Sequence, residues 1–256
     1  MKSLALAIAL VAVTPQKDVS AAAAGLASAD PSIRTRAACE LRELGSQAVS
    51  AMPRLVALLE DGSPVDAAVC GERTWGNGRF RGAQESTTPG EQAASALVAI
   101  GTPAYDPLTR ALGGPAWIAR TNAAWALGAL GNRRAIPLLS RSMADTEPNV
   151  RKRSAWALGA LDASEAVPAL VEALKDTDAG VREQAAWALG AIGDRRAVDG
   201  LVGALGDPVA GVRKQAAWAL GAIGDNRAVQ GLMKGLKDTD AGVRKQSAWA
   251  LGAIGG

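Results

Sequence analysis

Five tryptophans recur along this 256-residue chain at a constant interval of 31 residues. Each stands in the phrase AWALGA. A catalytic residue is needed once in a site, whereas a phrase at a fixed period indicates stacked structural units that bury their apolar faces on one another. We therefore expect these five side chains to form a structural ladder: Trp125, Trp156, Trp187, Trp218 and Trp249.

One unit runs from Thr177 to Asp207 and contains two apolar-periodic segments separated by Gly-Asp. Each segment is long enough for about three helical turns. On a helical wheel, Val181, Ala185 and Leu189 share one face, which would pack on a matching stripe of the second segment. The unit is therefore a helix hairpin, and the chain is predicted to be an all-α, right-handed α-solenoid over residues 23–256, ending in a half repeat at 239–256.

The tryptophan of each unit points away from the interior of its own hairpin. Ala186 and Gly190 lie four residues apart on one flank of the first helix, and a glycine inside a helix costs about 1 kcal/mol relative to alanine. We expect these small residues to leave a groove that receives the tryptophan of the neighbouring repeat, which would be mostly buried there. The alternative is an exposed aromatic stripe that binds a partner.

Six arginines form a second ladder, each five residues before a tryptophan slot, and acidic residues recur just before the first helices. Asp30, Asp178 and Asp240 are placed to cap a helix N-terminus or to pair with an arginine of an adjacent repeat. The arginines are Arg34, Arg120, Arg151, Arg182, Arg213 and Arg244.

The phrases DAGVREQAAWALGAIGD and RRAV…LV…AL resemble the HEAT-like repeats named after phycobilin lyases, over roughly residues 30–256. The resemblance implies an α-solenoid with first helices on the convex side and second helices on the concave side. It also implies a protein-interaction scaffold, because most members of this repeat class serve that role and only a few are enzymes. The concave surface would then carry Arg141, Glu172, Asp199 and Lys234.

Composition limits the chemistry of the chain. There is no histidine, which is the commonest general base and metal ligand, and two cysteines cannot form a tetrahedral zinc site. We predict no catalytic residue, metal or cofactor. With 28 basic and 25 acidic residues and no long basic run, nucleic-acid binding is not expected. The predicted function is a non-enzymatic scaffold for a protein or peptide; alternatives are a lyase-like accessory or chaperone for a prosthetic group, or the sensor part of a larger receptor.

The repeat is interrupted once. Cys39 and Ser95 occupy successive tryptophan slots, but about 25 extra residues separate them, within an insertion at about 62–90. Long loops of this kind are often functional, and exposed aromatics beside arginines are typical contact residues, although they could equally pin the loop to the solenoid. The candidate binding residues are Arg73, Trp75, Arg79, Phe80 and Arg81.

The two ends of the chain and its cysteines suggest further properties. Residues 1–22 have a basic start and an apolar run from Leu4 to Val13, which is typical of a signal peptide. The run is too short to span a membrane. The alternative is an amphipathic or buried first helix. Export, to the periplasm or outside the cell, would favour a disulfide between Cys39 and Cys70, whereas a cytoplasmic protein would keep free thiols. The terminal half repeat would expose an apolar surface suited to end-to-end association.

Overall fold

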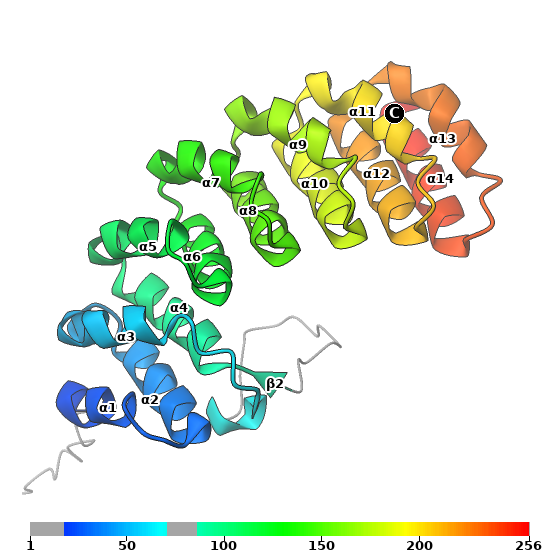
Figure 1. Cartoon of the computed structure of the whole chain (residues 1–256). Coiled ribbons are helices and arrows are strands. Elements are labelled where there is room, and N and C mark those ends of the chain that lie inside the picture. Colours follow the sequence, from blue (N-terminus) through cyan, green and yellow to red (C-terminus); the bar gives the residue numbers. More distant parts are fainter. Residues whose placement is uncertain (1–17, 71–85, 256) are drawn as a thin grey trace, which may run out of the picture.

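The computed structural model describes residues 18–70 and 86–255. Over these residues the chain forms pairs of helices stacked side by side along a curved path (Figure 1). The long first helices are α2 (Pro31–Leu44), α4 (Pro89–Ile100), α6 (Trp117–Ala129), α8 (Pro148–Ala160), α10 (Ala179–Ile192), α12 (Ala210–Ile223) and α14 (Ala241–Gly255). The short second helices are α1 (Val19–Gly25), α3 (Met52–Leu58), α5 (Tyr105–Leu112), α7 (Ile136–Ser142), α9 (Val167–Ala173), α11 (Val198–Ala204) and α13 (Val229–Gly235).

Local sequence signals set where the helices begin and end. The Asp178 carboxylate caps α10 by accepting a hydrogen bond from the backbone N–H of Val181 at 3.0 Å, which satisfies one of the free donors of the first turn. Gly193 ends α10 in the left-handed region, with φ of 71°. Asp194 then caps the short 3-10 turn η6 (Arg195–Ala197), which leads into α11. The same succession follows α12, where Gly224 has a φ of 70° and Asp225 caps the 3-10 turn η7 (Asn226–Ala228).

The core lies between the two helix layers, as the wheel pattern predicted. Val181, Ala185 and Leu189 of α10 are fully buried. Val198 and Leu201 of α11 are also fully buried, and α11 packs mainly on the following first helix, α12. Successive first helices also pack directly on one another, whereas successive second helices make few contacts. The small side chains of the first helices allow this closer packing.

This difference in packing determines the curvature. The layer whose helices lie closer together has the shorter path and forms the inside of an arc. Figure 1 shows the first helices on the inner side and the second helices on the outer side. The expectation that second helices form the concave face is therefore wrong. The four residues predicted to line that face are exposed on the convex layer, in α7, α9, α11 and α13: Arg141, Glu172, Asp199 and Lys234.

The inserted segment between α3 and α4 adds a small antiparallel pair of strands. β1 (Val65–Asp66) pairs with β2 (Ser86–Thr87), with Val65 opposite Thr87. Between them, η2 (Ala67–Cys70) lies against α2. The segment therefore reaches the inner, first-helix side of the solenoid. In the part of the chain that the structure describes, no helix is long and apolar enough to cross a membrane.

Candidate interaction surface

The tryptophans line the concave surface and pack between first helices. A Cβ placed on Gly190 would lie 2.6 Å from Cζ3 of Trp218, and the same construction on Gly159 gives 2.8 Å to Trp187. The indole edges of Trp156, Trp187, Trp218 and Trp249 thus lie directly on the glycine of the preceding repeat, which explains why a mid-helix glycine recurs. The contact is the one predicted from the small-residue flank.

The indoles are less buried than expected. Trp125, Trp156, Trp187 and Trp218 pack against the core but remain partly exposed, and Trp249 is 49% exposed. Trp125 and Trp156 stack with ring centroids 6.2 Å apart and an interplanar angle of 19°, within the range that aromatic pairs favour. Both sequence interpretations therefore apply to Trp156, Trp187 and Trp218. One edge of each ring packs on a glycine, while the rest of the ring belongs to the concave surface.

Charged side chains cross the same surface from one first helix to the next. The Lys152 chain passes over Gly180, with its Cδ 3.5 Å from a Cβ placed there, and Lys214 passes over Gly242 at 3.4 Å. Glu183 occupies the equivalent slot between them. Apolar stems that cover the joint while the charged groups stay in water are usual for such side chains. The surface thus combines partly exposed indoles with mostly cationic groups.

The ladder is interrupted at α4, where Ser95 takes the tryptophan slot. The glycine slot is also changed, because Arg42 of α2 and Val98 of α4 stand three residues after their tryptophan slots. The result is a cavity of about 590 Å³ on the first-helix side. It is lined by Arg42, Gln92, Ser95, Val98, Ala99, Trp125 and Ala129. A smaller cavity of about 190 Å³ adjoins it, sharing Gln92, Ser95 and Trp125 and adding Thr87, Glu91, Asn122 and Arg153.

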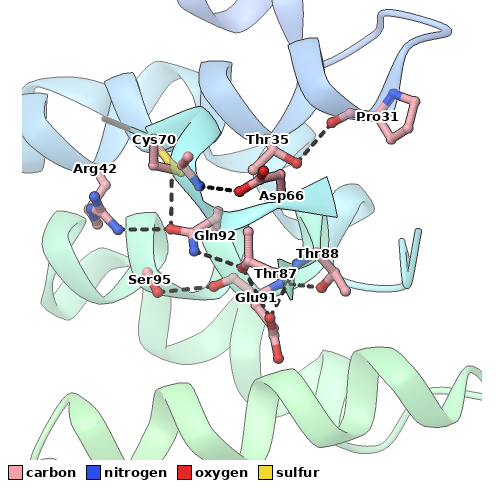
Figure 2. The surroundings of a disulfide bond; sticks show 12 residues. Pro31, Thr35, Arg42, Asp66, Cys70, Thr87, Thr88, Glu91, Gln92 and Ser95 are labelled. Carbon is pink, nitrogen blue, oxygen red and sulfur yellow. Dashed lines mark hydrogen bonds between the residues drawn. A yellow bond between two sulfur atoms is a disulfide. The ribbon is translucent and has the colours of Figure 1, made fainter. Parts of the chain in front are cut away.

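A buried polar network forms one wall of this cavity (Figure 2). The Gln92 side chain is 4% exposed; its Oε1 accepts a hydrogen bond from Nη1 of Arg42 at 2.8 Å, and its Nε2 donates to Oγ1 of Thr87 at 2.9 Å. Thr87 donates in turn to the Glu91 carboxylate at 3.1 Å. Glu91 also forms a capping box with Thr88 at the start of α4. Because every member is partnered, the wall is rigid and pre-formed.

The disulfide predicted between Cys39 and Cys70 is present, which confirms that pairing. Cys39 is 3% exposed, and its Sγ lies 3.4 Å from Oε1 of Gln92. The bridge fixes the end of η2 on α2 (Figure 2). It lies next to Gln92, which lines the cavity. The resemblance placed the first helices on the convex side, but the bridge ties the insertion to the concave side, because α2 is a first helix and the first helices form that side.

The arginine ladder joins consecutive repeats along the loops that precede the first helices. Arg151 pairs with Asp176 through two hydrogen bonds of 2.7 Å, and its Nη1 donates to the carbonyl oxygen of Asp145 at 2.8 Å. The hydrogen bond from Arg151 lowers the pKa of Asp176, and the one from Arg213 lowers the pKa of Asp238 to about 2. Equivalent pairs are Arg34–Asp61, Arg120–Asp145, Arg182–Asp207 and Arg213–Asp238.

The sequence suggested that the aspartate before each first helix either caps the helix or pairs with an arginine. In the structure two different aspartates take these two roles. Asp178 and Asp240 cap helices, whereas the arginine partner is the aspartate two residues earlier, as in Asp176 and Asp238. The recurrence of this second aspartate exactly one repeat apart was a signal that the sequence analysis missed. The arginine ladder has no member in α4, because Gly90 stands in the arginine slot. The N–H of Gly90 donates a hydrogen bond to the Asp61 carbonyl oxygen at 3.0 Å.

The five loop residues predicted as contacts lie outside the described residues: Arg73, Trp75, Arg79, Phe80 and Arg81. Within residues 18–70 and 86–255, no group of three or more histidine, cysteine or carboxylate side chains is placed to hold a metal ion.

The stacked helix hairpins define an α-solenoid. A family model described as HEAT repeats matches residues 90–148, 141–215 and 205–256. The chain therefore belongs to the HEAT-repeat family, and the predicted all-α solenoid is confirmed.

Three solved structures illustrate the likeness. The complex of CpcE and CpcF of phycocyanin lyase from Nostoc sp. PCC7120 is 24% identical, with a TM-score of 0.50, over 99% of this chain and 100% of that one. An engineered protein is 25% identical with a TM-score of 0.50, over 92% of this chain and 68% of that one. The Kap95:Nup1 complex shares 14% identity and a TM-score of 0.67, over 92% of this chain and 36% of that one.

The resemblance to repeats of the phycobilin-lyase type is thus confirmed in the fold. No functionally curated protein sequence shows a significant match to the chain.

Proposed function

We propose that this protein is a non-enzymatic scaffold that binds a partner polypeptide along its concave face. The observation that carries the proposal is the series of partly exposed indoles from Trp125 to Trp218 on that face. Tryptophan is enriched among residues that dominate binding energy. Here the rings of Trp156, Trp187 and Trp218 are held in place by their glycine contacts, and Trp125 is held by stacking on Trp156. The lysines beside the rings favour a partner with acidic residues. Kap95, a solenoid of similar fold, is known in a complex with Nup1.

The experiment compares charge reversal on the two faces. Lys152→Glu with Lys214→Glu alters the concave face, and Lys175→Glu with Lys234→Glu makes the same charge change on the convex side. Immobilised protein and both variants are used to capture proteins from the native host, with quantification by mass spectrometry. The proposal expects at least one partner that is retained by the convex variant and reduced tenfold or more by the concave variant. Equal retention by both variants would contradict it.

We also propose that the protein works outside the cytoplasm. The supporting observations are the disulfide in the described structure and the apolar N-terminal run of the sequence. A signal peptide ending near residue 22 would remove part of α1, whose Ala22 and Ala23 are buried, so cleavage before Val19 fits the fold better. N-terminal sequencing of protein from each cell fraction tests this; an intact N-terminus in the cytoplasmic fraction would refute it.

A lyase-like accessory or chaperone role for a prosthetic group is the second candidate. It is favoured by the cavity of about 590 Å³ beside Trp125, which has the size of a small-molecule site. The absorption spectrum and mass of protein purified from its native host distinguish the two: a stoichiometric small molecule supports this candidate.

End-to-end association remains a proposal as well. The outer face of α14 is free in the described structure: Trp249 is largely exposed, and a Cβ on Gly252 would contact nothing within 4 Å. Concentration-dependent mass in analytical ultracentrifugation would support it, and a constant monomer mass would refute it.

A further inference from the structure

We propose that the gap at Ser95 is an anchor pocket for an aromatic side chain of the partner, flanked by acidic residues. This inference rests on the proposed scaffold function and specifies which chemistry that function recognises. Its starting point is the regularity of the ladder. At the four joints from α6 to α14, an indole carried by one helix lies on the glycine of the helix before it.

At the joint between α2 and α4 the indole is absent. Ser95 has a short side chain whose Oγ donates to the Glu91 carbonyl oxygen at 3.0 Å. The space that a ring would occupy is the cavity bounded by Arg42 of α2, Ser95 of α4 and Trp125 of α6. At the other joints this space is filled by a tryptophan of the protein itself. At the joint between α2 and α4, an indole from a partner chain can therefore occupy it.

The exposed side of Trp125 supplies the aromatic contact. Trp156 stacks on one side of Trp125 at 6.2 Å, and Trp125 lines the cavity on the side facing Ser95. A ring entering there would extend the stack by one member. Offset and edge-to-face aromatic pairs are favourable beyond the area that they bury, so an aromatic side chain suits the site better than an aliphatic one.

The charges around the cavity define the flanking residues. Arg42 lines the larger cavity, and Arg153 lines the smaller cavity that adjoins it. Lys152 extends the cationic surface over the next joint. The carboxylate of Glu91 is already engaged with Thr87 and with the backbone of Thr88. Carboxylates next to the aromatic residue would therefore meet the guanidinium group of Arg153 and the ammonium group of Lys152.

The wall of the pocket is fixed before any partner arrives. The Gln92 amide is held by Arg42 and Thr87, and the disulfide holds η2 beside it. A pre-formed site loses less conformational entropy on binding.

The test uses a fluorescein-labelled peptide, Asp-Glu-Trp-Asp-Glu, measured by fluorescence polarisation on the full chain. An Asp-Glu-Ala-Asp-Glu peptide removes the ring, and a Lys-Lys-Trp-Lys-Lys peptide reverses the charge. We expect the first peptide to bind at least tenfold more tightly than either of the others. Equal affinity for the first two peptides overturns the aromatic anchor, and equal affinity for the first and third overturns the acidic flank.

Ser95→Trp fills the gap from within and should weaken binding of the first peptide at least tenfold. Ser50→Trp, at an exposed position of η1 (Gly45–Ala51), is the matched control and should change affinity less than twofold. Circular dichroism confirms that both variants fold; if Ser95→Trp does not, Ser95→Phe replaces it. Unchanged binding to the filled variant overturns the proposal.

Two further outcomes separate this inference from the broader one. If Ser95→Trp keeps the native partner while the concave charge variant loses it, the scaffold function stands and the anchor pocket is refuted. If the peptide binds only after Trp75→Ala or Phe80→Ala, the pocket is occupied by this chain itself, and the assignment to a partner is refuted.

Discussion

Replacing Gly190 by alanine tests whether the ladder contact is as tight as the structure shows. The new methyl group would lie 2.6 Å from Cζ3 of Trp218 and 2.7 Å from Cα of Ala219. Both distances are well below van der Waals contact, and Ala219 Cα belongs to the backbone of α12, which cannot turn aside like a side chain. The helices α10 and α12 must therefore separate locally, or the indole must leave its place.

Two effects of opposite sign decide the result. Alanine favours a helix interior over glycine by about 1 kcal/mol, and overfilling a packed site costs about 1 to 3 kcal/mol. Because one of the clashing atoms is backbone, we expect the upper part of that range. The net expectation is a destabilisation of about 1 to 2 kcal/mol, equivalent to a fall in Tm of about 2 to 8 °C for a domain of this size.

Gly252→Ala is the matched control, because Gly252 has the same slot in α14 with no heavy atom within 4 Å of an added Cβ. Only the helix-propensity term remains there, so the variant should gain a few tenths to about 1 kcal/mol. Urea unfolding followed by circular dichroism measures both variants. If Gly190→Ala stabilises the protein as Gly252→Ala does, the reasoning about the ladder contact is refuted.

Three further predictions concern other parts of the repeat. Ser154→Ala should stabilise the protein by about 1 kcal/mol, because the buried Ser154 hydroxyl has no hydrogen-bond partner and equivalent slots hold Ala123 and Ala185; a loss of stability in thermal unfolding would contradict this. The pKa of Asp238 is lowered to about 2 from an ordinary 3.8. Its ion pair therefore stabilises the fold at pH values above 3.8 and loses this effect as the pH falls towards 2. We expect the unfolding midpoint to drop in that pH window, and to drop by less in Asp238→Asn; an equal drop in this variant would refute the assignment. Cys70→Ser should lower the free energy of unfolding by about 3 to 4 kcal/mol by opening the 31-residue loop; two titratable thiols in the unreduced wild-type protein would show that the bridge does not form.

The sequence by itself determined the local structure and the pairing of neighbours. A period of 31 residues, capping aspartates and a Gly-Asp break are short-range signals, so the helix hairpin could be predicted. The contact between Trp218 and the Ala186–Gly190 flank could be predicted too, because a costly glycine inside a helix needs a close neighbour to explain it. The cysteine pair followed from an even count and a signal-like N-terminus.

Only the tertiary structure decided which layer faces inward. Curvature depends on the difference between two helix spacings, summed over every joint, and no single residue carries it. The choice of Asp176 over Asp178 as the partner of Arg151 also required the positions of two adjacent repeats. The cavity at Ser95 arises in the same way. Ser95, Arg42 and Val98 are unremarkable in the sequence, and they define a pocket only because stacking places their three slots side by side with Trp125.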